Sequence, residues 1–378
     1  MKTFARTDRS PLGEWWWTVD RWSIVALLAL ICMGAILSFA ASPAVAVRIG
    51  QSSMHFVTRQ FLFLIPAVAV LFATSLLAPR GVRRVAFVLL GVGLVMLVLT
   101  LFVGADIKGA RRWLGIGSFA IQPSEFVKPA FIVAVAWVFA EGGRHSRALG
   151  FALGALLYVM VAGLFVLEPD FGQTLLVSLT FAALVFLAGV SWLWIAGIAV
   201  AGLGGAVLAY VSVPHVASRV DRFLDPASGD TFQVDKAKEA IIHGGLTGVG
   251  PGEGIVKRVI PDAHTDFVFS VAAEEYGLIL GLVLIGLFGF VVVRGLARAF
   301  SEEDQFVQLA ASGLFILFGL QAFVNIGVNV TLLPAKGMTL PFISYGGSSL
   351  VALALAMGMA LALTRRRPSL RLLQEYRA

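Results

Sequence analysis

The sequence predicts an all-α protein that crosses a membrane ten times, with both termini on the cytoplasmic side and one large outer loop. Of its 378 residues, 58% are hydrophobic and only 13% are charged, whereas a soluble domain is usually about half apolar and roughly a quarter charged. Apolar runs long enough to span a bilayer recur along the whole chain. Basic residues gather on alternate connections between these runs. Together these features exclude a soluble globular protein.

The apolar runs are separated by Gly, Pro and charged residues. A cleaved signal peptide is the alternative for the first run, but its length and the Trp15-Trp16-Trp17 anchor before it favour a retained helix. The fifth and sixth runs are divided only by the Glu-Pro-Asp of 168–170. The ten expected spans are 23–41, 56–78, 85–104, 125–141, 148–167, 172–189, 192–212, 267–293, 306–331 and 342–363.

The distribution of Lys and Arg orients these spans. With a cytoplasmic N-terminus, 16 of the 29 basic residues fall on the cytoplasmic side, against seven in the short outer segments. We therefore expect a cytoplasmic segment 1–22, a membrane domain 23–364 and a basic cytoplasmic tail 365–378. The long periplasmic loop would be 213–266, between the seventh and eighth spans, with a short amphipathic helix at 233–242. Because topology accounts for the positive charge, we expect no nucleic-acid partner.

The outer segments contain most of the residues that can do chemistry. They are rich in polar residues, Gly and Pro, while the cytoplasmic connections are short basic turns. Lys336 lies between Pro334 and Pro341, where a helix is disfavoured, and irregular backbone near membrane depth mainly lines a cavity or is buried in protein. Arg111, in the first outer loop, is either a solvated surface residue or a ligand for an anionic headgroup. Function is therefore expected on the outer face.

Several polar residues at the span ends have simple structural interpretations. Glu125 and Lys128 are three residues apart and are spaced for an ion pair on one helix face. Asp170 precedes a span at the position of a helix N-cap. In the ninth span a polar stripe of Gln321, Asn325 and Asn329 recurs every four residues, which predicts interhelical hydrogen bonds or a cavity lining.

Asp266 stands at the mouth of the eighth span and has two interpretations. A carboxylate there caps the helix, or it acts as a general base toward a hydroxyl of a membrane-tethered substrate. Glu274 and Glu275 follow eight and nine residues later, and intramembrane acids are rare enough to be candidates for function. They are the next candidates if Asp266 proves to be only a cap.

Five ordered motifs give the chain a resemblance to a known family. They are GARRWL (109–114), QPSEFVKP (122–129), EPDFGQT (168–174), AHTDFVF (263–269) and LLPAKGMTLPFISYGGSS (332–349). The chain resembles the SEDS family (shape, elongation, division and sporulation) over essentially its whole length. The wording of the last motif is more similar to the cell-division member than to the elongation member, which stays the alternative.

The resemblance implies a ten-helix glycosyltransferase of the bacterial inner membrane, at the division septum. Such enzymes polymerise lipid II, an undecaprenyl-diphosphate-linked disaccharide-pentapeptide. The family's catalytic Asp corresponds to Asp266, while Arg111 and Lys336 match its basic residues. Glu125, Lys128 and Ser344, which lie in the matching motifs, are further substrate-binding candidates. The secondary candidates are His264, from the motif that contains Asp266, and the intramembrane acids Glu274 and Glu275.

The resemblance also implies cofactors and partners. A divalent cation, Mg²⁺ or Mn²⁺, is expected to support activity through ligands that the sequence does not identify, and no organic cofactor is expected. The expected partners are a class B penicillin-binding protein, an FtsI-like septal transpeptidase, and other membrane proteins of the division machinery. A lipid II flippase and a non-catalytic scaffold are the other hypotheses. A transporter should show repeat symmetry and midplane sites, whereas a scaffold leaves the charged outer cluster unexplained.

Overall fold

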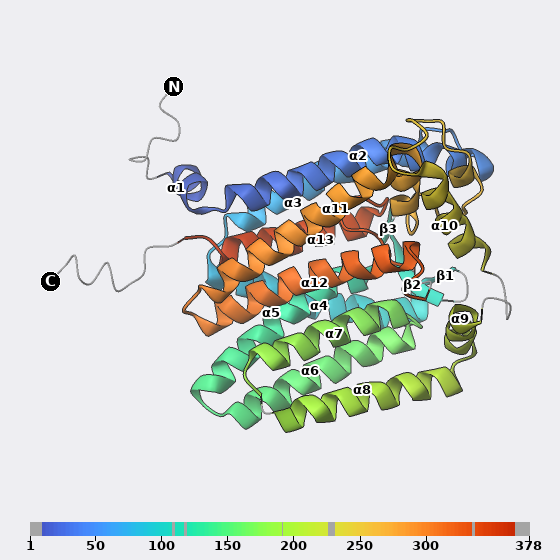
Figure 1. Ribbon diagram of the computed structural model, residues 1–378. Helices are drawn as coiled ribbons and strands as arrows, with labels where there is room; N and C mark the ends of the chain where they lie inside the picture. The colour runs from blue at the N-terminus through green and yellow to red at the C-terminus, as the bar shows by residue number, and fades with distance from the viewer. Residues whose placement is uncertain are drawn as a thin grey trace.

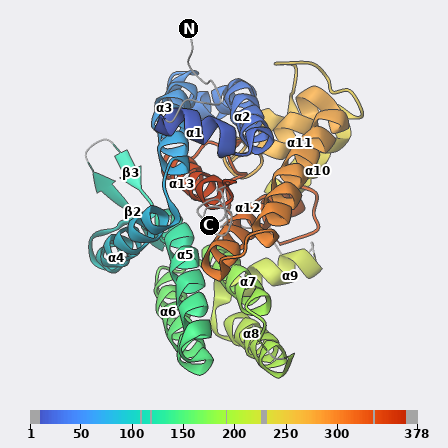
Figure 2. The ribbon, with the colours of Figure 1, turned by 90° about the vertical axis from the view of Figure 1, so that its left-hand side faces the viewer.

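The structure is a computed structural model in which long helices form one elongated bundle (Figures 1 and 2). It describes residues 10–107, 110–116, 119–190, 192–225, 231–334 and 337–366. The long helices are α2 (Arg21–Arg48), α3 (His55–Ser75), α4 (Pro79–Val103), α5 (Pro123–Arg144), α6 (Arg147–Leu167), α7 (Phe171–Leu187), α8 (Trp192–Ser212), α11 (Val268–Phe300), α12 (Gln305–Asn329) and α13 (Gly347–Leu363). Each coincides broadly with one expected span.

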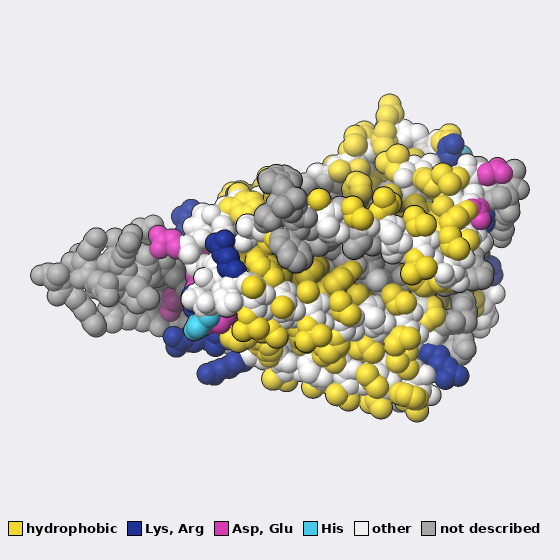
Figure 3. Space-filling view, turned by 90° about the horizontal axis from the view of Figure 1, so that it is seen from below, with side chains coloured by type: hydrophobic (Ala, Val, Ile, Leu, Met, Phe, Trp, Pro, Cys, Tyr) yellow, Lys and Arg dark blue, Asp and Glu magenta, His cyan; other side chains and the backbone are white. Residues whose placement is uncertain are grey.

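Seven of the described helices are long and apolar enough to cross a membrane, namely α2, α3, α4, α5, α6, α11 and α12. Helices α7 and α13 have 17 residues each and are also apolar. The chain is therefore a multi-pass membrane protein. Figure 3 shows a face whose middle is hydrophobic and whose Lys and Arg side chains gather toward its two ends, as expected for a bilayer-spanning bundle.

Helices α5, α12 and α13 form the buried centre of the bundle. Nearly every residue of α13 is buried, and α5 packs against α4, α6 and α12. By contrast, α4 and α6 bury only a narrow stripe and expose large apolar side chains such as Val95, Phe102 and Leu156. The peripheral helices α4 and α6 thus face lipid, whereas the central helices α5, α12 and α13 are shielded from it by their neighbours.

The described ends of the chain meet at one end of the bundle. The short helix α1 (Pro11–Thr18) docks there because the indole of Trp15 donates a 2.9 Å hydrogen bond to the hydroxyl of Ser75. The Arg365 Nε donates to the Thr18 hydroxyl at 3.0 Å. Residues 1–9 and 367–378, which include most of the expected basic tail, lie outside the described residues.

The other end of the bundle is covered by the segments that the sequence assigns to the outer face (Figure 1). They contain a small antiparallel sheet, β1 (Ala105–Ile107), β2 (Ala110–Ile116) and β3 (Phe119–Ile121), in the order β1-β2-β3. Helices α9 (Pro214–Leu224) and α10 (Phe232–Gly244) and the 3-10 turn η2 (Val256–Arg258) follow. The α10 helix confirms the expected amphipathic segment. The sheet departs from the all-helical prediction, because strand pairing satisfies the backbone of the segment between α4 and α5 where that segment folds back onto the bundle.

The eighth expected span is not one continuous helix. Gly277 has φ 79° and ψ 177°, so α11 consists of a short first part, residues 268–276, and a long second part. The first part is buried almost throughout, whereas Leu278, Ile279 and Leu282 beyond the break are exposed. The two parts of α11 therefore have different surroundings, protein for the first and lipid for the second.

Candidate active site

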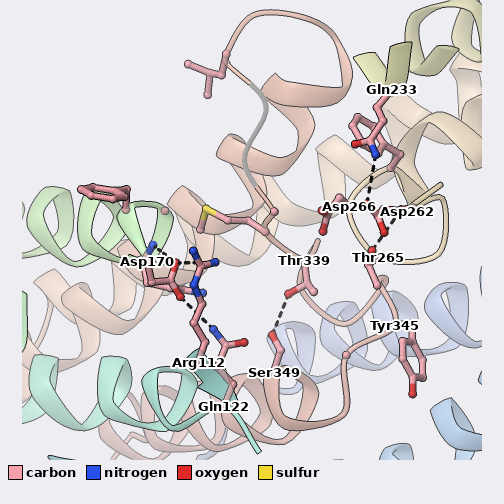
Figure 4. Close-up of a pocket in the computed structure, with 18 of the residues that line it drawn as sticks. Arg112, Gln122, Asp170, Gln233, Asp262, Thr265, Asp266, Thr339, Tyr345 and Ser349 are labelled. Carbon is pink, nitrogen blue, oxygen red and sulfur yellow. Dashed lines mark hydrogen bonds and ion pairs between the residues drawn. The ribbon is translucent and has the colours of Figure 1, made fainter. Parts of the chain in front are cut away.

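A cavity of about 900 Å³ opens at the end of the bundle that carries the sheet, α9 and α10. Its walls come from α3, β2, β3, α5, α7, α9, α10, the start of α13 and irregular segments around 262–267, 331–333 and 337–346. Figure 4 shows two groups of polar side chains on opposite sides of the cavity. One group contains Arg112, Gln122 and Asp170, and the other contains Asp262 and Asp266. The cavity thus joins segments that lie far apart in the sequence.

Asp266 lies in the segment before α11 and lines the cavity. The N-cap of α11 is Phe267, so Asp266 precedes the cap position by one residue. Its carboxylate lies beside Gly337, where a Cβ atom would stand 3.2 Å from Oδ2. This placement disfavours the interpretation of Asp266 as a simple N-cap and puts its carboxylate at the cavity wall.

The polar stripe on α12 fixes the backbone of Asp266. The amides of Asn325 and Asn329 each donate a 2.9 Å hydrogen bond to the Asp266 carbonyl oxygen. Asn325 also donates to the Met338 carbonyl, and Gln321 to the Thr339 carbonyl at 3.1 Å. The stripe therefore serves as an interhelical hydrogen-bonding surface that joins two irregular segments of the cavity wall to one buried helix.

Two further side chains hold the segment that leads to Asp266. Arg48, at the end of α2, donates hydrogen bonds to the carbonyl oxygens of residues 259, 260 and 261, the shortest being 2.7 Å. The Ser344 hydroxyl donates to the Thr265 carbonyl and accepts from the Leu340 N–H at 2.8 Å. Ser344 is buried and does not line the cavity. Ser344, which was predicted to bind substrate, therefore lies behind the cavity wall and holds its backbone by hydrogen bonds.

The opposite wall is built on a buried network at the start of α5. Lys128 lies 2.9 Å from the Glu125 carboxylate and donates a 2.6 Å hydrogen bond to Gln173, which in turn donates to Glu125 at 2.7 Å. Glu125 and Gln173 line the cavity, while Lys128 lies behind them. The expected ion pair is therefore present, and it shapes the wall with one carboxylate facing the cavity.

Arg112 extends this wall toward the sheet. It donates to the carbonyl oxygens of Glu168 and Pro169, and its guanidinium lies 3.8 Å from the Asp170 carboxylate. Asp170 caps α7, as predicted, by accepting from the Gln173 N–H. Gln122 donates a 3.2 Å hydrogen bond to the other Asp170 oxygen. A cation and an acid thus stand side by side at the cavity.

Glu168 is a buried acid behind Arg112. Burial, partly opposed by a hydrogen bond from the Thr100 hydroxyl, raises the pKa of Glu168 to about 7. The nearby Asp170 carboxylate raises that pKa further, and Arg112 lowers it. The protonation of Glu168 therefore changes near neutral pH.

The secondary candidates lie away from the cavity. His264 is buried between Phe56 and Tyr345, with ring centroids at 4.3 and 5.5 Å, and burial lowers its pKa to about 4. Glu274 and Glu275 are buried on the first part of α11 and contact residues 256 and 257, between α10 and α11. None of the three lines the cavity, so the geometry favours packing and positioning roles.

The cationic candidates differ in their position relative to the cavity. Arg111 is exposed and does not line the cavity, whereas its neighbour Arg112 does. The adjacent β2 residues Arg112 and Trp113 both line the cavity, because the register of β1 and β2 shifts at this point, so the sequence alone could not say which arginine faces inward. Lys336 lies outside the described residues. Arg59, Arg222 and Lys238, which sequence reasoning did not single out, also line the cavity.

The cavity is suited to a sugar-phosphate substrate. Among the described residues it is lined by the cations Arg59, Arg112, Arg222 and Lys238 and the acids Glu125, Asp170, Asp235, Asp262 and Asp266. Cations bind phosphate oxygens, and carboxylates accept hydrogen bonds from hydroxyl groups. No group of three or more His, Cys, Asp or Glu suited to a metal ion occurs in the described part of the chain.

Comparison with known proteins agrees with this chemistry. The family model described as "cell cycle protein" (FtsW/RodA/SpoVE) matches residues 21–368. The chain belongs to the FtsW/RodA/SpoVE family. A relative from Caulobacter vibrioides, named a probable peptidoglycan glycosyltransferase FtsW, is 52% identical over 97% of this chain and 94% of its own length. Another of that name, from Coxiella burnetii, is 34% identical over 91% of this chain and 96% of its own length.

Solved structures of the FtsW/RodA/SpoVE family share the fold. A chain from a peptidoglycan synthase complex that coordinates polymerization and crosslinking superposes with a TM-score of 0.77, at 31% identity over 92% of this chain and 97% of that one. The Thermus thermophilus rod shape determining protein RodA gives a TM-score of 0.70, at 29% identity over the same shares. The predicted SEDS family membership is thereby confirmed.

Proposed function

We propose that this protein is a peptidoglycan glycosyltransferase that polymerises lipid II into glycan strands during septal cell division, with Asp266 as the general base. The observation that carries the proposal is the placement of Asp266 at the wall of a polar cavity in a membrane bundle, with its backbone held by Asn325 and Asn329. The FtsW name of the relatives supports the reaction class and the septal role.

Asp266 would take the proton from the 4-hydroxyl of the acceptor sugar as the hydroxyl oxygen attacks the anomeric carbon of the donor. The new bond is between this oxygen and the anomeric carbon. The bond that breaks joins the anomeric carbon to the phosphate oxygen, and the lipid diphosphate leaves with the electron pair. The proton is then on the Asp266 carboxylate, and the chain has grown by one disaccharide.

Cationic side chains would stabilise the diphosphate as its charge develops. Arg59, Arg112, Arg222 and Lys238 line the cavity and can approach such a group from several sides. The guanidinium of Arg112 is oriented by hydrogen bonds to the carbonyl oxygens of residues 168 and 169. Lys336 stays a proposed diphosphate ligand on the motif alone.

A divalent cation would find oxygen ligands at the same place. Asp262 and Asp266 both line the cavity, and carboxylates with water and substrate phosphates are the ligands that Mg²⁺ prefers. The residues therefore fit a weakly held Mg²⁺ or Mn²⁺ that is completed by substrate. Such an ion would supply charge stabilisation at the diphosphate.

We further propose ten membrane spans with both termini in the cytoplasm of a bacterium and the cavity on the periplasmic side of the inner membrane. The ten long helices and the bias of basic residues support this arrangement. The domain division at 1–22, 23–364 and 365–378 follows from it. A class B penicillin-binding protein is the proposed partner, since a relative of the same fold is part of a complex that polymerises and crosslinks.

The proposal is tested by purifying the chain with and without a class B penicillin-binding protein and supplying labelled lipid II. Glycan strands resolved on a gel, in either preparation, are the expected product. Transfer of lipid II across a vesicle bilayer with no polymer in either preparation would contradict the proposal and favour a transporter.

A further inference from the structure

The break in α11 is filled by a piece of the long outer loop. At an ordinary helix position, the N–H groups of Leu278 and Ile279 would donate to carbonyl oxygens one turn earlier. They donate instead to the carbonyl oxygens of Gly245 and Leu246, at 2.9 and 3.2 Å. The two freed carbonyl oxygens, of residues 274 and 275, accept from the N–H groups of residues 249 and 250 at 3.0 Å each. Residues 245–250, the inserted segment, thus replace the hydrogen bonds lost at the break.

The insertion requires glycine on both sides. Gly277 and Gly248 have positive φ, 79° and 82°. A Cβ atom on Gly277 would stand 2.2 Å from the Leu246 carbonyl oxygen, and one on Gly248 would stand 2.2 Å from the Glu275 carbonyl oxygen. Any side chain at either position would therefore separate the inserted segment from the helix.

Glu274 fastens the next part of the loop to the same short helix. One of its carboxylate oxygens accepts from the backbone N–H groups of Ile255 and Val256, at 2.9 and 2.8 Å, and the other from that of Lys257 at 2.8 Å. The His243 Nδ1 lies 3.1 Å from the first oxygen. The Glu274 side chain is 0% exposed. Three backbone N–H donors and one imidazole nitrogen thus surround the buried Glu274 carboxylate.

A buried ion pair adds a second fastening. The Lys257 ammonium pairs with the Glu275 carboxylate and also donates a 2.8 Å hydrogen bond to the Ala40 carbonyl of α2. The outer loop, the first part of α11 and α2 are therefore joined at one point. The carboxylates of Glu274 and Glu275 therefore hold the surrounding segments together and do not face the cavity.

The short helix 268–276 connects this fastening to Asp266. At its start, Ser270 donates through its N–H and hydroxyl to the Asn329 side-chain oxygen, at 3.1 and 2.7 Å. At its end, Gly277 has non-helical backbone and gives no rigid continuation into the lipid-facing part of α11. The helix is thus held by α12 at one end and by the outer loop at the other.

We propose that Glu274 is a positioning residue, which sets the place of the Asp266 carboxylate by holding the short helix 268–276 against residues 255–257 of the outer loop. This inference rests on the proposed function, because it assumes that Asp266 is the general base. Glu274 lies outside the cavity and would not touch substrate. Its removal should therefore affect the chemical step more than substrate binding, since small displacements of a base cost as much as a hundredfold in rate.

The test compares Glu274→Gln with Glu253→Gln in the full-length protein, with its penicillin-binding protein partner wherever the wild type requires it. Glu253 is an exposed acid of the same loop, so its substitution removes the same charge without the three amide contacts. The glutamine at 274 keeps the size of the side chain, but one acceptor oxygen is replaced by an NH₂ group that faces N–H donors. The measurements are folded yield, kcat and KM for lipid II polymerisation, and the pH dependence of kcat/KM.

Glu274→Gln should lower kcat by about ten- to a hundredfold, leave KM within about twofold and shift the acid limb of the pH profile. Glu253→Gln should match the wild type. Partial misfolding would lower the rate by one factor at every pH and leave the acid limb in place, so the shift separates positioning from instability. A folded Glu274→Gln enzyme with wild-type kcat and pH profile would overturn the inference.

A second variant covers the case in which Glu274→Gln fails to fold. Glu274→Asp keeps the charge and withdraws the carboxylate by one carbon–carbon bond, so kcat should fall by less, with the acid limb shifted in the same direction. A wild-type rate and profile in Glu274→Asp would also overturn the inference. The proposed function fails separately: either the wild-type protein makes no polymer, or Asp266→Asn polymerises normally.

Discussion

Replacing Lys128 with methionine should destabilise the protein far more than an equivalent change near the other end of α5. Lys128 is 1% exposed and pairs with Glu125 at 2.9 Å, three residues earlier. Its loss leaves a buried carboxylate without a counter-charge, which costs about 3–5 kcal/mol of unfolding free energy. The Glu141–Arg144 pair on the same helix has the same spacing, but the Arg144 side chain is 62% exposed. Arg144→Met should therefore cost less than about 1 kcal/mol.

The assay is the free energy of unfolding of the purified protein in detergent, measured by denaturant titration. In the double variant Glu125→Gln, Lys128→Met, the buried charge is gone, and the glutamine oxygen can still accept from Gln173. This variant should recover most of the stability lost in Lys128→Met. The losses of unfolding free energy in Glu125→Gln and in Lys128→Met are measured separately as well. If these two losses simply add in the double variant, or if Lys128→Met costs no more than Arg144→Met, the buried ion pair does not stabilise the wall as described.

Three further outcomes are expected. Burial raises the pKa of Glu168 from 4.5 to about 7, so the folded state disfavours the ionised carboxylate. The free energy of unfolding should therefore fall by up to about 3 kcal/mol as pH rises from 4.5 through 7. Denaturant titrations at several pH values should show this fall in the wild type and not in Glu168→Gln. Arg112→Gln should impair lipid II turnover or affinity about tenfold or more, while the matched Arg111→Gln stays near wild type; equal losses would contradict the cavity assignment. In a chain without Cys32, Glu253→Cys should react with an impermeant thiol reagent in cells with a permeabilised outer membrane, and His145→Cys should not. Labelling of His145→Cys alone would invert the topology.

The sequence predicted the long helices well, because apolar runs are a strong local signal. Apolar runs specify spans in lipid, where the backbone must satisfy its own hydrogen bonds. Asp266 was singled out as a candidate because an acid at the mouth of an apolar run is rare, and the structure places it at the cavity wall. The pair of Glu125 and Lys128 and the N-cap at Asp170 followed from spacing alone, and the structure bears out both of these local arrangements.

What the sequence could not supply depends on contacts between distant segments. Glu274 resembled a catalytic candidate until the structure placed residues 255–257 around its carboxylate. The break at Gly277 is invisible in an apolar run, because a helix tolerates glycine and only the inserted loop shows why it is needed here. Likewise, Arg111 and Arg112 are equivalent in the sequence, and strand β2 alone decides which one faces the cavity.

The central claim, that Asp266 is the general base, is tested most directly by the lipid II polymerisation rate of Asp266→Asn beside Asp266→Ala. Asparagine keeps the size of the side chain and cannot accept the proton, so this variant should fold, bind its partner and lose about a hundred- to ten-thousandfold in rate. Because Phe267, not Asp266, is the N-cap of α11, Asp266→Ala should fold as well and be equally inactive. A near wild-type rate in Asp266→Asn would contradict the account and move the search for the base to Asp262 and the other acids of the cavity.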